Sequence, residues 1–285
     1  MLSVVSVKMN QAADCFIYNL PTNKLWLILL ERNIYTIQRY ANILLFIFTV
    51  IVNSIAGSTT LIGGRDTATV SNNNPTLITP AGYVFAIWGI IYILLGAFVV
   101  FQTLPRERTS DYHRKISWLF VLSSLINIAW IFVWQFESLI LSVVLIFALL
   151  ASLIAIYVRL NIGKSKVKTS ERLAVHLPFS VYLGWITIAS IADVAVTLTA
   201  YNWDGFGISP EIWAIIVVAL ALVITMLMLG IRRDIAYALV VIWALVGIGV
   251  NHSGNQNVLL LTEISSVLVA IGVLVTIVLT WLRRK

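Results

Sequence analysis

The stretch TPAGYVFAIWGIIYILLGAFVVFQ, residues 79–102, follows a polar loop and contains no charged residue. Because an α-helix rises 1.5 Å per residue, a run of this length can cross the roughly 30 Å hydrocarbon core of a bilayer. A plain lipid anchor needs neither spaced glycines nor aromatic residues between them. The stretch has both: Gly82, Gly89 and Gly96, and Phe85, Trp88 and Tyr92. It therefore predicts a membrane-spanning helix and raises the question of whether this helix also lines a site.

The whole chain has the composition of a membrane protein. Of its 285 residues, 60% are hydrophobic and 11% are charged, and the mean hydropathy is +0.96, whereas about 25% of the residues of a soluble domain are charged. Although the net charge is +7, no soluble segment is long enough to carry a basic surface for nucleic acid. The single Cys15 and three scattered histidines form no metal-ligand pattern. We expect an all-α polytopic membrane protein that binds neither metal nor nucleic acid.

Eight segments are long and apolar enough to be predicted as membrane-spanning helices. They cover residues 39–58, 80–102, 115–135, 138–160, 174–199, 210–230, 234–250 and 257–282. The basic residues alternate in step with these spans, because all but one of the 19 Lys and Arg residues fall on the same side and Arg65 alone falls on the other. Since cytoplasmic loops are rich in Lys and Arg, the pattern predicts a cell (inner) membrane protein with both termini cytoplasmic.

Two segments outside the spans need a separate interpretation. Residues 1–38 contain apolar patches too short to cross a bilayer, and they lack the pattern of a signal peptide. We interpret them as a cytoplasmic or interfacial extension, or as the product of an upstream start site, since Met9 is also available. The loop from Thr59 to Thr79 is long and polar, and it is either a flexible connection or a lid over the second span.

Three of the predicted spans contain short motifs of aromatic and polar residues. The second has Pro80 followed by Val84, Phe85, Trp88, Tyr92 and Gly96, the third has Asn127, Trp130 and Trp134, and the fifth has Pro178, Tyr182, Trp185, Ala189 and Asp193. In order and spacing these motifs resemble helices two, three and five of the TspO/MBR family of tryptophan-rich sensory proteins, the relatives of the peripheral benzodiazepine receptor or translocator protein. The resemblance covers about residues 39–203 and implies a five-helix bundle there.

The chain also departs from the pattern of that family. The family motif VFGPVWT is VFAIW here, without the internal proline, and Asp193 stands in place of an asparagine. The cholesterol-recognition pattern of animal members is absent after Tyr201, so sterol binding is disfavoured. Residues 204–285 have no counterpart in a five-helix bundle. We therefore predict a long form with an extension (1–38), a TspO-like bundle (39–203) and three additional transmembrane helices (204–285).

The resemblance implies a membrane receptor, sensory or regulatory protein, or transporter, for a flat hydrophobic ligand such as a porphyrin or haem-type tetrapyrrole. Carried over residue by residue, it implies a ligand-binding site made of Phe85, Trp88, Tyr92, Asn127, Trp130, Trp134, Tyr182, Trp185, Ala189 and Asp193. Indoles stack on a planar ring, and Asn127 and Asp193 would engage its polar substituents. We expect no other cofactor and no enzyme activity, because no Ser, His and acid set and no nucleotide-binding motif can be assembled.

The same residues allow a second interpretation, in which they only pack helices together. Each motif places its residues on one face of its helix, and small residues let membrane helices approach closely. The three glycines of the opening stretch, spaced by seven, favour packing. For the tryptophans the two interpretations are balanced, because lipid cannot satisfy an indole N–H in the interior of a span.

Two acidic residues, Asp193 and Glu263, lie inside predicted spans, each roughly 10 Å from the outer end. An ionised carboxylate is costly within a bilayer and usually faces the bundle interior or water. Either each acid is protonated or bonded to polar neighbours such as Asn53 or Asn127, or the two share a proton at matching depth. The shared proton would suit the alternative function, a proton-coupled secondary transporter. A third alternative is a structural assembly partner, and the formation of a homodimer stays open.

Overall fold

The computed structural model describes residues 22–107 and 110–282. Contacts divide the chain into two compact units, residues 1–41 and 42–285, and each is described by itself. The described residues of the first unit belong to helix α2 (Thr22–Ser58), which continues into the second unit. The helix therefore begins within the predicted extension and not at residue 39, because no glycine or proline interrupts residues 22–38. The prediction for residues 1–21 lies outside the described residues.

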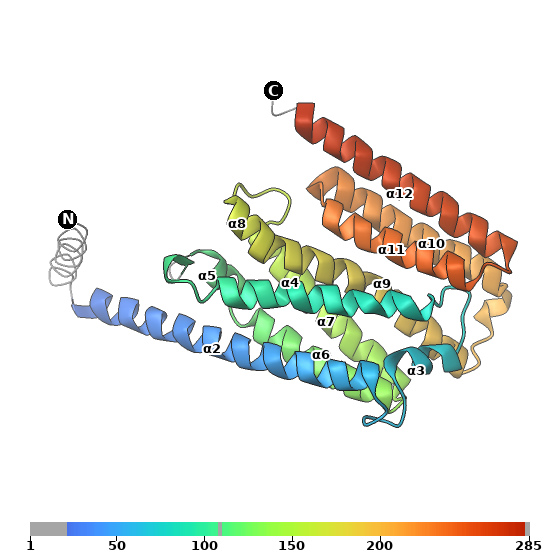
Figure 1. Cartoon of the computed structure of the whole chain (residues 1–285), viewed down its shortest axis with the longest axis horizontal. Coiled ribbons are helices and arrows are strands. Elements are labelled where there is room, and N and C mark those ends of the chain that lie inside the picture. Colours follow the sequence, from blue (N-terminus) through green and yellow to red (C-terminus); the bar gives the residue numbers. More distant parts are fainter. Residues whose placement is uncertain (1–21, 108–109, 283–285) are drawn as a thin grey trace. The chain divides into compact units, whose positions relative to one another are not determined.

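The second unit consists of helices joined by turns (Figure 1). After α2 come α3 (Thr67–Asn73), the 3₁₀ turn η1 (Gly82–Ala86) with α4 (Ile87–Phe101), η2 (Pro105–Glu107), α5 (Tyr112–Ile116), α6 (Leu119–Gln135) and α7 (Leu139–Leu160). They are followed by α8 (Thr169–Glu171), the π-helical turn η3 (Arg172–His176), α9 (Leu177–Ala200), η4 (Gly205–Gly207), α10 (Pro210–Leu227), the π-helical turn η5 (Met228–Arg232), α11 (Ile235–Asn251) and α12 (Gln256–Leu282).

Six of these helical stretches in the described residues are long and apolar enough to cross a membrane, and α6 and α11 are shorter apolar helices. Each predicted span coincides with one of them. The prediction of an all-α, polytopic membrane bundle is confirmed. The long loop after the first span is not fully irregular, because α3 forms within it and is capped by the Asp66 carboxylate, which accepts a 2.7 Å hydrogen bond from the Thr69 amide.

Local sequence explains where several helices begin and end. α10 begins at Pro210, which suits a first helical turn, and the preceding Ser209 caps it. α11 begins after Asp234, whose carboxylate accepts a 3.1 Å hydrogen bond from the Tyr237 amide. α7 ends at Asn161 with a φ of 53°, a left-handed conformation that asparagine tolerates better than most residues. These signals act over a few residues and are therefore readable from the sequence.

Helix α9 forms the centre of the second unit. In its most apolar window 61% of the residues are buried, against 39% or less in the other long helices. It packs against α4, α7 and α11, and α12 packs against α10 and α11 (Figure 1). At Gly184 the two helices α9 and α11 approach so closely that a Cβ would lie 3.2 Å from the Tyr237 carbonyl oxygen. The last three helices thus belong to one compact unit with the preceding ones, and the predicted boundary at residue 203 stays a prediction.

The packing role predicted for the glycines of the opening stretch holds at one of the three positions. A Cβ at Gly96 would lie 3.2 Å from the ring of Phe46 on α2. A Cβ at Gly82 or Gly89 would meet no described atom within 4 Å, so close helix packing does not require a glycine there. The spacing by seven residues shows only that the three glycines lie on one face of the helix. Whether a glycine is needed for packing depends on what lies opposite that face, so the packing prediction is wrong for Gly82 and Gly89.

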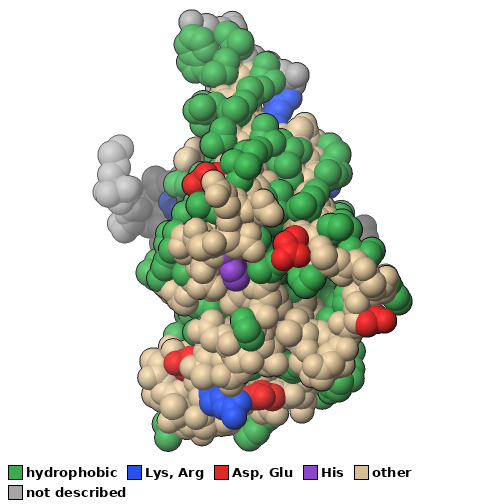
Figure 2. Space-filling model, turned by 90° about the vertical axis from the view of Figure 1, so that its right-hand side faces the viewer, with side chains coloured by type: hydrophobic (Ala, Val, Ile, Leu, Met, Phe, Trp, Pro, Cys, Tyr) green, Lys and Arg blue, Asp and Glu red, His purple; other side chains and the backbone are tan. Residues whose placement is uncertain are grey.

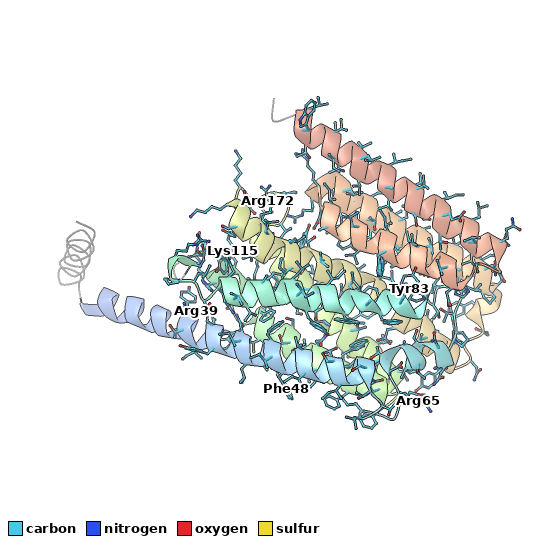
Figure 3. All side chains as sticks on the ribbon, viewed as in Figure 1. Arg39, Phe48, Arg65, Tyr83, Lys115 and Arg172 are labelled. Atoms are coloured by element: carbon cyan, nitrogen blue, oxygen red, sulfur yellow. The ribbon has the colours of Figure 1, made fainter. Side chains whose placement is uncertain are left out.

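Charged residues lie at the two ends of the bundle. Lys115 and Arg172 lie at one end, and Arg65, the lone basic residue of the other predicted side, lies at the opposite end (Figure 3). Arg65 forms an ion pair with Glu137. Figure 2 shows a view onto the Arg65 end, where backbone and polar side chains cover the centre and hydrophobic side chains gather along the sides. This arrangement fits a bundle that meets lipid along its sides, and the cytoplasmic side stays a prediction.

Candidate ligand-binding site

An apolar cavity lies among α3, α4, α6, α9, α10 and α11. Its volume is about 60 Å³, and since one water molecule needs roughly 10–15 Å³ by this measure, it holds only a few waters. Five aromatic side chains from α4, its preceding turn η1, α6 and α9 form one wall: Phe85, Trp88, Trp130, Trp134 and Trp185. Aliphatic side chains from α10 and α11 form a second wall, which contains no aromatic ring.

Trp88 is at the centre of the aromatic contacts. Its ring stacks on Tyr92 at a centroid distance of 5.7 Å, and it lies 6.1 Å from Trp130 and from Tyr182 and 6.2 Å from Trp185. These separations and the mixture of stacked and edge-on angles are those of favourable aromatic pairs. The three motifs of the second, third and fifth spans therefore meet at one ring.

The indole N–H groups of the cavity differ in whether they have partners. Trp130 Nε1 donates a 2.9 Å hydrogen bond to Asp193 Oδ2, and Trp134 Nε1 donates a 3.2 Å bond to the Thr67 carbonyl on α3. Trp185 is 2% exposed, and its Nε1 has no hydrogen-bond partner among the described residues. A buried donor without an acceptor is costly, so the Trp185 N–H is a donor that could bond to an acceptor on a bound molecule.

A sequence model of the TSPO-like protein family (TSPO_2) matches residues 39–281. The chain belongs to the TSPO-like protein family. The match extends beyond residue 203 and includes the last three helices. No curated protein and no solved structure matches the chain. Membership of the family agrees with the resemblance drawn from the three motifs.

The structure of this TSPO-like protein brings most of the predicted site residues to the cavity itself. The lining includes Phe85, Trp88, Trp130, Trp134, Trp185, Ala189 and Asp193. The other predicted residues, Tyr92, Asn127 and Tyr182, lie behind this lining. Tyr92 and Tyr182 contact Trp88, and the Asn127 side chain lies beside Tyr182. They support the aromatic wall from behind and do not line the cavity.

Asp193 is 1% exposed and both of its carboxylate oxygens have partners. Besides the bond from Trp130, Oδ1 accepts a 2.7 Å hydrogen bond from the Ser142 hydroxyl on α7. Asp193 therefore joins α6, α7 and α9 and fixes the orientation of the Trp130 ring. The predicted contact of Asp193 with polar substituents of a ligand stays a prediction, and in this structure its oxygens bond to Trp130 and Ser142.

Asn127 likewise serves as a link between helices. Its Oδ1 accepts a 2.8 Å hydrogen bond from Asn53 Nδ2, which joins α6 to α2. Both side chains are buried, and a polar pair of this kind stabilises helix association in an apolar medium. The alternative in which polar residues hold the helices together thus applies to Asn127.

Glu263 is not part of the site. Its side chain is exposed on α12, whereas Asp193 is buried and hydrogen-bonded to α6 and α7. The positions of the two side chains give the shared proton no support, and it stays a prediction. Matching depth along two helices says nothing about the directions in which their side chains point, and on α12 Glu263 lies on the outward face.

The sequence did not predict the part of the lining that comes from α3, α10 and α11. Thr67 and Ser71 come from α3, and the last helices contribute Val217, Val218, Ala221, Ala244, Leu245 and Ile248. These are ordinary residues for apolar helices and form no motif. Pro80, which begins the motif of the second span, also lines the cavity, although the site predicted from the sequence did not include it.

Proposed function

We propose that this TSPO-like protein binds a flat hydrophobic ligand in the cavity and acts as a sensory, regulatory or transport protein, without catalysis. A porphyrin or haem-type tetrapyrrole is the first ligand to test. The observation that carries the proposal is that five aromatic rings from three membrane-spanning segments line one wall of an apolar cavity. Aromatic rings offer flat faces for stacking on a planar molecule.

The unpaired indole of Trp185 supports a ligand over simple packing. Its neighbours Trp130 and Trp134 each have an acceptor, so the fold is able to satisfy an indole N–H at this depth. A tryptophan retained without one is a donor held ready for an acceptor atom on a ligand. A ring nitrogen, carbonyl or similar group of the ligand would meet this need.

The dimensions of the cavity define what binding requires. Pockets that hold drug-sized ligands measure roughly 300–1,000 Å³, whereas this cavity measures about 60 Å³. A tetrapyrrole therefore enters only if surrounding elements move apart. We propose that α3 is the element that moves, because it is a short helix. The hydrogen bond from Trp134 to the Thr67 carbonyl connects it to the cavity wall. This gives the loop 59–79 the role of a lid facing the extracytoplasmic side.

The polarity of the cavity limits the chemistry of the ligand. Among the described residues that line the cavity, Asp193 is the only acidic one and none is Lys or Arg. The Asp193 carboxylate already accepts hydrogen bonds from Trp130 and Ser142. An anionic group would therefore gain no partner inside. We propose that the apolar ring system is buried and that carboxylates, where a ligand has them, stay at the mouth of the cavity. Glu263 is exposed on α12 and Asp193 is buried, so the structure offers no support for a transporter coupled by these two carboxylates.

Titration of the purified protein in detergent with protoporphyrin tests the proposal, with the absorption band of the porphyrin as readout. Replacing Trp130 and Trp185 together by Ala removes two of the five rings of the aromatic wall, and we expect binding to weaken at least about tenfold. Trp185→Phe keeps a ring but removes the N–H, and we expect a smaller loss.

Trp118→Phe is the matched control, because Trp118 is 45% exposed and does not line the cavity. We expect this variant to bind as the unchanged protein does. Equal binding by the double variant and by the control would show that porphyrin binds elsewhere, for example in the detergent or on the outer surface, and would contradict the assignment of the site.

A further inference from the structure

The cavity has two chemically different walls. Rings come from α4, α6 and α9, whereas α10 and α11 contribute side chains without rings: Val217, Val218, Ala221, Ala244, Leu245 and Ile248. A flat ligand stacked on the rings would present its other face or its edge to this second wall. The residues of the second wall therefore limit how large a ligand stacked on the rings can be.

We propose that α10 and α11 form a fixed wall whose small residues, Ala221 and Ala244, set the largest planar ligand that the cavity accepts. The proposal rests on the proposed function and assigns a role to the three C-terminal helices. Ala221 is 5% exposed and Ala244 is fully buried. In both, the side chain is a single methyl group facing a cavity, so a longer side chain would take up the space that a ligand needs.

Selection by size requires a wall that does not move away, and hydrogen bonds fix it at the outer end. The Ala81 amide donates a 3.0 Å bond to the Gly247 carbonyl, and Trp243 Nε1 donates a 3.0 Å bond to the Val84 carbonyl. Asn251 Nδ2 donates a third bond of 3.0 Å to the Thr79 carbonyl. All three join α11 to the segment that leads into Phe85 and Trp88, so the aliphatic and aromatic walls are connected directly.

Close packing strengthens this connection. A Cβ added at Gly247 would overlap the Val84 side chain, which shows how closely α11 approaches η1. The Tyr83 ring lies edge-on to the Trp243 ring at a centroid distance of 5.4 Å. The turn η1 and the C-terminal half of α11 are therefore held in one register.

A buried carboxylate fixes the wall at its other end. Asp234, at the start of α11, accepts a 2.7 Å hydrogen bond from the Tyr157 hydroxyl on α7 and a 2.5 Å bond from the Ser180 hydroxyl on α9. With the contact at Gly184 between these two ends, α11 is attached to the neighbouring helices along its length. A larger residue at position 244 consequently projects into the cavity, because these bonds oppose an outward movement of α11. Ala221 lies on α10, which packs against α12 and α11, so a larger residue there projects into the same cavity.

The test is a series of planar probes of increasing size: naphthalene, pyrene and protoporphyrin, titrated into the purified full chain. We expect Ala221→Leu and Ala244→Leu to weaken protoporphyrin binding at least about tenfold and naphthalene binding by much less. Ala219→Leu makes the same change on the exposed face of α10, and Ala270→Leu makes it on α12 outside the cavity lining. Both controls should leave the whole series unchanged.

The results distinguish a failure of the size-selecting wall from a failure of the proposed function. If the unchanged protein binds the series and the Ala221 and Ala244 variants bind it equally well, the wall does not select by size, and the proposed function stands. If the unchanged protein binds no member of the series, the proposed function fails and this inference fails with it. Should a leucine variant not give monodisperse protein, Ala221→Val and Ala244→Val provide the same comparison with a smaller change, and an unaltered size limit in them overturns the proposal.

Discussion

The indole Nε1 of Trp130 donates a 2.9 Å hydrogen bond to Oδ2 of Asp193, and this bond joins α6 to α9 beside the cavity. The other carboxylate oxygen accepts from Ser142 on α7. Three helices thus depend on one buried acid, and the ring that it orients is part of the aromatic wall. The stability of the bundle and the shape of the candidate site are therefore linked through Asp193.

We expect Asp193→Asn to lower stability by about 1–3 kcal/mol, because an amide accepts at one atom only and one of the two bonds, from Trp130 or from Ser142, is lost. Thermal unfolding in detergent measures the effect. The matched control is Glu263→Gln, which changes the other acid predicted within a span. Since Glu263 is exposed, we expect a change within about 0.5 kcal/mol. Equal effects of the two substitutions would contradict the different environments of the two acids.

The approach of α11 to η1 predicts opposite outcomes for two glycines. Gly247→Ala places a methyl group against Val84, and we expect a loss of about 1–3 kcal/mol from overpacking. Gly89→Ala meets no described atom within 4 Å and improves helix propensity, so we expect a gain of up to about 1 kcal/mol. Unfolding midpoints of the two variants, measured side by side, check both signs. A stable Gly247→Ala protein would show that η1 and α11 are not in close contact.

We expect the stability of the protein to depend strongly on Asp234, the residue at the start of α11. Asp234→Ala removes the cap of α11 and leaves the hydroxyls of Tyr157 and Ser180 without their acceptor. We expect a loss of about 2 kcal/mol or more. Asp204→Ala removes a carboxylate that caps the exposed Phe206 amide, and its loss should stay at or below about 1 kcal/mol. A larger effect at Asp204 would reverse the order that burial predicts.

The bond between Trp134 and Thr67 holds α3, so we expect its loss to increase the local opening of α3 besides any effect on global stability. Trp134→Phe keeps an aromatic ring in the cavity wall but removes the donor that holds α3. We expect faster hydrogen exchange in residues 67–73, with unchanged exchange in α12, because opening is local where few bonds hold a segment. Exchange that stays the same in residues 67–73 would show that this bond does not hold α3 in place.

The sequence by itself predicted the membrane, the eight spans, the all-α fold and the residues that form the aromatic wall. Hydropathy and the rise of a helix act within single segments, and the motifs place Trp88, Trp130 and Trp185 on definite positions of their helices. For the same reason the ends of α10 and α11 were readable from Ser209 and Asp234.

Only the tertiary structure decided which of these residues lie together and in what role. Trp243 bonds to Val84 across 159 positions of the chain, and Asp193 meets Trp130 across 63. No periodicity within one helix records what lies opposite it, so the sequence does not distinguish Glu263, which is exposed, from Asp193, which is buried. The aliphatic wall of α10 and α11 was absent from the sequence prediction because alanine and valine are ordinary residues of an apolar helix. Only the tertiary structure shows which of them face the cavity.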